Sequence, residues 1–130
     1  MVFERKTAKT LAEVDAAIRA AAISYKFGVL SVINLKEKLL DKGLDLASEC
    51  SVYEVCNPHQ AKRALEANGA VSTALPCRIS VYGVAGDYKI ATILPTAMMR
   101  AFGSPVIDQV AQEVEQDLVA MIREAAESNA

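Results

Sequence analysis

Residues 77–94 read CRISVYGVAGDYKIATIL, and this stretch decides the fold. Both halves are rich in β-branched and aromatic residues, and the short segment 85–87, which contains a glycine, separates them. This pattern predicts a β-hairpin with strands at 77–84 and 88–94. The two strands of a hairpin are antiparallel, so the sheet that contains them must be at least partly antiparallel.

Further elements are predicted on both sides of the hairpin. Short β-branched runs predict strands at 2–7, 29–33 and 51–56, although the first is short. Apolar spacing and capping residues predict helices over 11–25, 35–42, 58–68 and from 105 to near the chain end. The predicted caps are Thr10, Asn34, Asn57 and Ser104, and Gly28 and Gly43 are read as helix stops.

This order of elements predicts an α+β fold. We expect a mostly antiparallel sheet of about five strands, helices packed on one of its faces, and a long C-terminal helix. The chain has 130 residues and is 52% hydrophobic, so residues 1–130 are expected to form a single domain with an aliphatic core.

Composition excludes several classes of function. The formal net charge is -2, which leaves no basic excess for binding nucleic acid. No apolar run approaches about 18 residues, so no membrane span is expected. The charged first ten residues do not resemble a signal peptide, and three cysteines match no secreted disulfide pattern. A cytoplasmic protein with reduced thiols is therefore expected.

The hairpin also predicts an assembly. Cys77, Ile79 and Val81 share one face of their strand, while the residues between them form a mixed, semi-apolar second face. If the helices cover only one face of the sheet, this second face needs a partner. The simplest partner is a second copy of the chain, which predicts a homodimer.

Two cysteines next to prolines are the best candidates for chemistry. Cys56 ends a predicted strand just before Asn57 and Pro58, and Cys77 begins another just after Pro76. If these strands are antiparallel, both thiols lie at the same end of the sheet. Cys56 also precedes a helix N-terminus, which favours a thiolate. The alternative is that both are small buried hydrophobic residues.

Other candidates are weaker. His59 with Cys56 and Cys77 would give three soft ligands for a metal, but no fourth protein ligand is visible, and we predict no metal and no cofactor. Met98 is either core or an adaptable wall for a ligand. Arg78 is either an anion contact or a surface charge, and Glu54 either faces water or is a buried acid with a raised pKa. No catalytic constellation is present, which favours a protein that is not an enzyme.

These motifs resemble a known family. The run Val52–Pro58, the Ala64–Glu66 turn and the run Leu75–Arg78 look like the bacterial and archaeal domain of unknown function numbered 302. Leu35–Lys38 and Lys42-Gly43 fit as well. The resemblance implies a strand-helix-four-strand-helix fold, usually found as a homodimer, and no established activity. It matches Cys56 and Cys77 to the two motif cysteines and leaves Cys50 outside.

Two hypotheses of function follow. In the first, the chain is a small homodimeric module that binds a small ligand near the cysteine end of the sheet, through Cys56, Asn57, Cys77, Arg78 and Met98. In the second, it is a thiol-based redox or sulfur-handling protein that uses Cys56 with Cys77.

Overall fold

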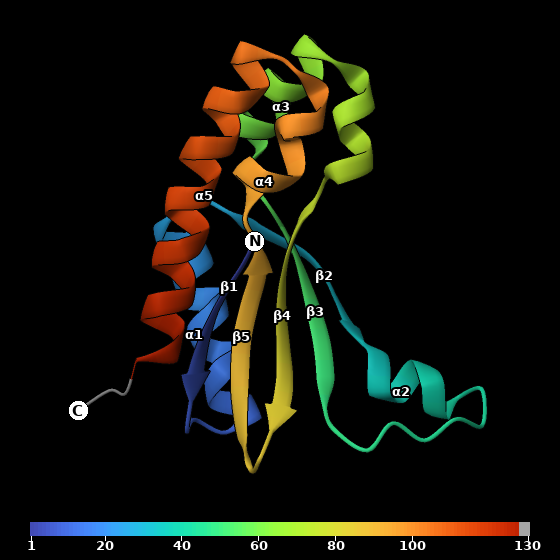
Figure 1. Cartoon of the computed structure of the whole chain (residues 1–130). Helices are drawn as coiled ribbons and strands as arrows, with labels where there is room; N and C mark the ends of the chain where they lie inside the picture. The colour runs from blue at the N-terminus through green and yellow to red at the C-terminus, as the bar shows by residue number, and fades with distance from the viewer. Residues whose placement is uncertain (128–130) are drawn as a thin grey trace.

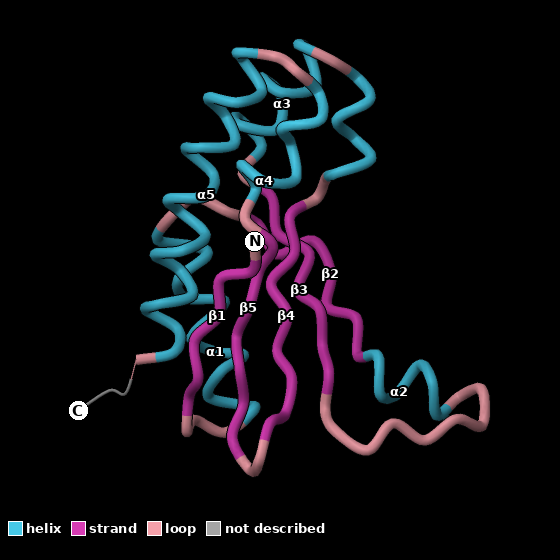
Figure 2. The backbone as a smooth tube through the Cα atoms, in the orientation of Figure 1, coloured by secondary structure: helices cyan, strands magenta, loops and turns pink. Residues whose placement is uncertain are grey.

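The predicted hairpin lies inside a five-stranded sheet in the computed structural model, which describes residues 1–127 (Figures 1 and 2). The strands are β1 Val2–Thr7, β2 Gly28–Asn34, β3 Cys50–Cys56, β4 Cys77–Val84 and β5 Asp87–Ile93. Their order across the sheet is β1-β5-β4-β3-β2. Every neighbouring pair is antiparallel. The sheet is therefore antiparallel throughout, whereas the sequence predicted a mostly antiparallel sheet.

Helices cover one face of this sheet and extend beyond both of its ends. The helices are α1 Leu11–Ser24, α2 Leu35–Leu40, α3 Pro58–Ala67, α4 Pro95–Met99, α5 Pro105–Ala126, and the short 3-10 segments η1 Gly69–Ala74 and η2 Arg100–Phe102. Helices α1 and α5 pack against the sheet, whereas α3, η1 and α4 gather at one end and α2 projects from the other (Figure 1). The predicted α+β class and long C-terminal helix are confirmed.

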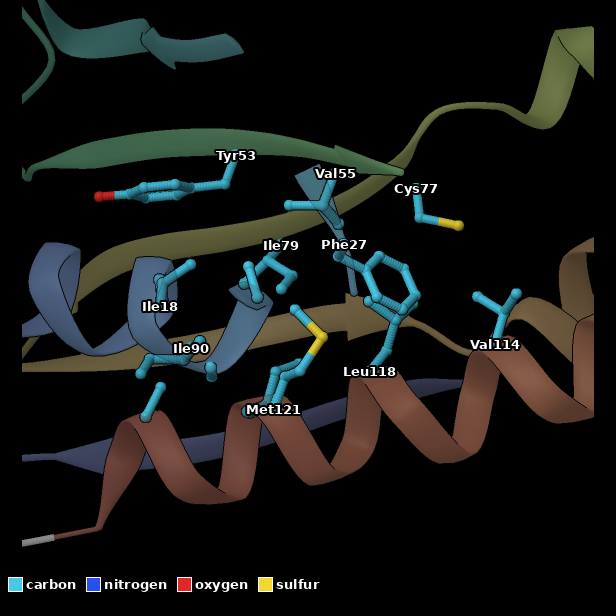
Figure 3. Close-up of a cluster of buried hydrophobic side chains, with 14 of the residues drawn as sticks. Ile18, Phe27, Tyr53, Val55, Cys77, Ile79, Ile90, Val114, Leu118 and Met121 are labelled. Atoms are coloured by element: carbon cyan, nitrogen blue, oxygen red, sulfur yellow. The ribbon is translucent and has the colours of Figure 1, made fainter. Parts of the chain in front are cut away.

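The core fills the space between the sheet, α1 and α5. Ile18 of α1, Ile79 and Ile90 of the central strands, and Leu118 and Met121 of α5 are all at most 1% exposed. Figure 3 shows these side chains in one cluster, with Cys77 at one end of it. The core is aliphatic, as the composition predicted, because burial of such side chains supplies most of the folding free energy.

The predicted helix caps are present. Thr10 forms a capping box with Glu13 at the start of α1. Asn34, Asn57 and Ser104 each accept a hydrogen bond from a backbone N–H of the helix that follows. Proline occupies the first turn of both α3 and α5, where its missing N–H removes no helical hydrogen bond.

One local prediction was wrong, and two short elements were missed. The left-handed residue after α1 is Lys26 (φ +64°), not Gly28, which is instead the first residue of β2. The Phe27 N–H bonds back to the Ala22 carbonyl and closes the helix end there. The segments η1 and α4 were not predicted at all, because they span six and five residues and show no helical repeat.

The three last residues of the predicted domain, 128–130, lie outside the described part of the chain. Smaller differences affect the ends of elements. Helix α2 ends at Leu40 instead of 42, and β5 begins at Asp87 instead of 88. Gly43 does adopt the left-handed conformation (φ +78°) that the sequence predicted after this helix.

The uncovered face of the sheet is more polar than expected. Ion pairs cross between neighbouring strands on it, joining Lys89 to Glu4 at 3.0 Å and Lys6 to Asp87 at 3.4 Å. Arg78 and Glu54 form a third pair at 3.4 Å. Cross-strand pairs of opposite charge stabilise a solvated face. This face therefore offers less apolar surface for a partner than the hairpin pattern indicated.

Candidate functional site

The cysteine end of the sheet is assembled by the antiparallel pairing of β3 with β4. Cys77 lies opposite Val55, the residue next to Cys56. Strand spacing and rise place the Cα atoms of Cys56 and Cys77 about 6 Å apart. The condition for bringing the two thiols to the same end of the sheet is thus met, and both cysteines are free.

A small apolar cavity lies beside these two cysteines. It is lined by residues of β3, α3, β4, α4 and α5 and by Phe27 and Leu75 from the loops before β2 and β4, and the lining includes Val55, Cys56, Asn57, Gln60, Cys77 and Val114. The space open to the centre of a water-sized sphere is about 20 Å³. That is room for about one water molecule, or for one group of a larger ligand. We call this the inner cavity.

Burial makes both thiols weak acids. Desolvation raises the pKa of Cys56 above its ordinary value. For Cys77 the same cause, together with the neighbouring Cys56, raises the pKa to about 11. The predicted lowering of the Cys56 pKa by the following helix is therefore wrong.

The helix cap leaves no free backbone N–H of the first turn of α3 for the Cys56 thiol. The first free N–H groups of this helix, on His59 and Gln60, both donate to Asn57 Oδ1, at 3.1 and 3.2 Å. A thiolate at Cys56 would need those same donors. The predicted Asn57 cap is present, and it takes up the groups that the reactivity argument required.

Gln60 brings an unpaired acceptor to the wall of the inner cavity. Its Nε2 donates to Asp117 Oδ2 of α5 at 3.2 Å, which fixes the orientation of the amide. Its Oε1 has no partner, and within residues 1–127 it is the one buried side-chain N or O atom of which this is true. A buried unpaired acceptor costs free energy, about 1–3 kcal/mol. A bound N–H or O–H donor would remove that cost.

The Asn57-x-x-Gln60 spacing is that of a capping box, in which the Gln60 side chain would bond back to the Asn57 backbone N–H. The side chain instead reaches across to α5, because Asn57 alone caps the helix. Other carboxylates of α5 have similar partners: Glu113 pairs with Arg63 at 2.8 Å, and Glu124 accepts from Tyr25 at 2.8 Å. The acidic side chains of α5 therefore include contacts to α3 and to the end of α1, and they do not only face solvent.

Cys77 also lines a second cavity. Its lining residues are Pro76, Cys77, Arg78, Thr92, Ile93, Pro95 and Met98, and it is larger, about 70 Å³ by the same measure. We call this the outer cavity. Met98 is half-buried here, whereas its neighbour Met99 is 1% exposed and belongs to the core and the inner cavity wall.

Arg78 stands at the edge of the outer cavity with its charge already partnered. Its side chain is 58% exposed and lies 3.4 Å from Glu54, which also accepts a 2.6 Å hydrogen bond from Ser31. Glu54 is only 20% exposed, so it neither faces water freely nor stands alone in the core. Its own placement falls between the two alternatives that the sequence left open.

The five predicted binding residues are thus divided between two cavities. Cys56 and Asn57 line the inner one, Arg78 and Met98 line the outer one, and Cys77 lines both. The sequence missed Gln60 as a wall residue and also missed Ile93 and Pro95. Ile93 and Pro95 adjoin the predicted hairpin, but nothing in the sequence relates Gln60 to Asp117.

The three metal candidates do not form one site, although Cys56 and Cys77 lie close together. His59 is exposed on the first turn of α3, whereas Cys77 is 6% exposed. Within residues 1–127 no group of three or more His, Cys, Asp or Glu side chains is placed to hold a metal ion. The same part of the chain has no helix with the length and apolar content to cross a bilayer.

Comparison with known proteins agrees with this fold. Residues 3–125 match the model of the family described as "Domain of unknown function DUF302". A solved structure, of an uncharacterized conserved DUF302 protein from Bacillus stearothermophilus, superposes with a TM-score of 0.91. It is 29% identical, and the match covers 97% of this chain and 98% of that one. No curated protein matches the chain.

Proposed function

The chain belongs to the DUF302 family, and from this premise and the geometry of the cysteine end we propose that it binds a small ligand beside Cys77. The family description assigns no activity, so the proposal rests on the two cavities. Cys77 forms part of the wall of each, which makes it the residue around which a ligand would be held.

The observation that carries the proposal is the unpaired Oε1 of Gln60. Buried polar groups in folded proteins almost always have partners, and an exception calls for an unseen one. The inner cavity offers this acceptor together with two thiols that are protonated at neutral pH. It therefore favours a group that donates one hydrogen bond and is otherwise apolar.

The outer cavity indicates the rest of the ligand. Ile93, Pro95 and Met98 give it an apolar lining. The Thr92 hydroxyl already donates to the Arg78 carbonyl at 2.8 Å, so it has no hydrogen to donate to a ligand. Arg78 at its edge can exchange Glu54 for an anionic group. The ligand class is a small, mainly apolar molecule with a hydrogen-bond donor at one end and an anionic group at the other.

Native mass spectrometry of the protein purified from its own host tests this function. We expect a retained small molecule, or a mixture, that is lost in the Gln60→Met variant. The control variant is Gln109→Met, which alters an exposed glutamine of α5. Retention that is equal in both variants, or absent from the parent protein, contradicts the proposal.

The thiol-based alternative has one favourable observation, the position of Cys56 and Cys77 along the same cavity. Their raised pKa values argue against it, because the thiolate is the reactive form. Alkylation at neutral pH decides between the two. We expect Cys56 and Cys77 to react more slowly than a free thiol, and fast labelling that Cys56→Ser abolishes would favour the alternative.

The proposal includes a homodimer in the cytoplasm. Support for the dimer comes from exposed apolar side chains on β2 and α2, such as Leu30 at 63% and Leu40 at 59%. Support for the location comes from the three cysteines, an odd number. Sedimentation at micromolar concentration should give twice the 13.9 kDa mass of one chain. A monomer at that concentration contradicts the dimer.

A further inference from the structure

Helix α4 forms part of the wall of both cavities. It follows β5 directly and packs against α5 at the cysteine end of the sheet (Figure 1). Its residues Pro95 and Met98 line the outer cavity, whereas Met99 lines the inner one. Consecutive residues of a helix point about 100° apart, so one short helix can face two separate spaces. A displacement of α4 would therefore change both cavities at once.

A carboxylate of α5 holds the first turn of α4. The residue before this helix is Leu94, whose apolar side chain cannot cap it. Glu115 supplies the missing acceptor: its Oε1 accepts from the Thr96 N–H at 3.1 Å and from the Thr96 hydroxyl at 2.6 Å. In the described part of the chain, no other side-chain hydrogen bond joins residues 95–102 to another element. The polar attachment of α4 thus depends on a single carboxylate.

Helix α3, the other short helix beside the inner cavity, is attached more firmly. Its Arg63 donates two hydrogen bonds to Glu113 of α5, at 2.8 and 3.1 Å, in addition to the bond between Gln60 and Asp117. Helix α3 has ten residues, whereas α4 has five and is too short to be stable on its own. Local opening selects segments with few contacts, and of these two helices α4 is that segment.

The residues at the two ends of segment 95–102 differ in freedom. Before it, the Leu94 N–H donates to the Met1 carbonyl at 2.8 Å, which holds the end of β5 in place. After it, Gly103 adopts the left-handed conformation, with φ +57°. Apart from its chain neighbours, no atom lies within 4 Å of the point where a Cβ would be attached to Gly103. Hinges are residues of this kind, at the ends of elements and free to change their backbone angles.

We infer that α4 is a movable cover of the ligand site, that Glu115 holds it closed through Thr96, and that the ligand enters when α4 moves away about Gly103. The cover rests on the proposed function and adds the route of entry to the same site. The proposed ligand places its donor at Gln60 in the inner cavity and its anionic group at Arg78 by the outer one. Displacement of α4 takes Met99 and Met98 out of the two walls, and both spaces then open beside Cys77.

The rate at which iodoacetamide alkylates Cys77 tests the cover without any ligand. Cys77 is 6% exposed, so this thiol reacts only after part of its surroundings has opened. We expect Glu115→Ala to raise the rate at Cys77 at least tenfold, as measured by peptide mass spectrometry. Glu115→Gln should raise it less, because the amide oxygen can still accept from Thr96. Cys50, at the opposite end of β3, should react at an unchanged rate.

Glu124→Ala is the matched control for this experiment. It also removes a carboxylate of α5 that holds another element, since Glu124 accepts from the Tyr25 hydroxyl at 2.8 Å, but it makes no contact with α4. Equal rates at Cys77 in Glu115→Ala and Glu124→Ala overturn the inference. If Glu115→Ala raises the rates at Cys50 and Cys77 together, the whole chain is unfolding, and Thr96→Val decides instead. That variant removes only the 2.6 Å bond, and a rate at Cys77 equal to that of the parent overturns the inference.

Hydrogen exchange identifies which helix opens. In Glu115→Ala we expect the amides of residues 96–99 to exchange at least tenfold faster than in the parent, with those of residues 61–67 in α3 unchanged. Faster exchange in α3 and not in α4 overturns the inference, because α3 would then be the wall that moves. Neither measurement needs a ligand, so the cover and the proposed function, which native mass spectrometry tests, can fail separately.

Discussion

The two ends of the sheet differ in whether their buried polar groups have hydrogen-bond partners. Toward the end away from the cysteines, Tyr53 packs in the core and its hydroxyl donates to Asp15 at 2.6 Å. At the cysteine end, Gln60 has one amide atom partnered and the other unpaired. The first end is a finished core and the second is incompletely packed. We place the ligand site where packing and hydrogen bonding are both incomplete.

The largest effect is expected in the finished part of the core. Leu118 of α5 is 0% exposed and belongs to the core between α5, α1 and the sheet. Leu118→Ala should therefore cost about 3 kcal/mol of unfolding free energy. The matched control is Val106→Ala on the same helix, where the side chain is 48% exposed and the loss should stay within about 0.5 kcal/mol. Urea titration measures both. A loss below about 1 kcal/mol for Leu118→Ala would show that the core is looser than the comparison assumes.

Tyr53→Phe tests whether the partnered polar group matters. The variant loses the hydrogen bond to a charged acceptor, and Asp15 is 42% exposed, so we expect a loss of about 1–2 kcal/mol. Tyr82→Phe is the control, because its hydroxyl bonds to Glu4 on the exposed face. A loss as small as in the control would contradict a special role for this pair.

The same variant should change the pH dependence at both extremes. The Tyr53 hydrogen bond lowers the pKa of Asp15, so its stabilisation is present above about pH 4 and is lost as pH falls further. Burial and Asp15 raise the pKa of Tyr53, so that contribution is present below about pH 10 and is lost above it. The difference in unfolding free energy between parent and Tyr53→Phe should therefore be largest between these limits. A difference that does not vary with pH would exclude this coupling.

The sequence was a better guide to the packed end than to the site. Strand β4 was predicted with its exact bounds, because alternating apolar residues record which side faces the core. Gln60 was missed because its partner Asp117 lies 57 residues away, and only the packing of α3 on α5 brings them together. Lys26 was missed because glycine is the usual signal for a left-handed residue, and here a lysine adopts that conformation.

The position of the two cysteines could be predicted from the sequence only under a condition on the strand directions. That Cys56 and Cys77 share one end of the sheet followed only if β3 and β4 were antiparallel, and the helix between them allowed either direction. Their acidity could not be predicted, because it depends on burial and on the occupation of the α3 amides by Asn57.

Asn57→Ala should have a moderate effect on stability and a second effect on the site. Loss of the cap should cost about 1 kcal/mol. Asn57→Ser keeps an acceptor and should retain most of that stability. Asn57→Ala also frees the backbone N–H groups of His59 and Gln60 beside Cys56, so alkylation of Cys56 at neutral pH should become faster in this variant. Unchanged labelling would show that burial alone keeps this thiol protonated.

Gln60→Met should give the smallest change in unfolding free energy. It tests directly whether the cysteine end of the sheet contains an unpaired acceptor. The variant loses the hydrogen bond to Asp117 but also removes the unpaired buried acceptor, and methionine has a similar length and shape. The cost of an unpaired acceptor, about 1–3 kcal/mol, is set against the bond to Asp117, a charged but partly exposed acceptor whose bond is worth about 1–2 kcal/mol, as for Tyr53 and Asp15. The ligand-free variant should therefore be more stable than the parent, by up to about 1 kcal/mol, since the two terms partly cancel.

Whether Gln60→Met raises or lowers the free energy of unfolding tells whether Gln60 Oε1 lacks a partner in solution. A water molecule in the inner cavity would satisfy Oε1, but a stable water needs two to four polar partners, and two protonated thiols are weak ones. If Gln60→Met is less stable than the parent without ligand, Oε1 is already satisfied in solution and the observation behind the proposed site is lost. If it is more stable, the parent maintains an unpaired acceptor at a cost, as expected where a ligand supplies the missing donor.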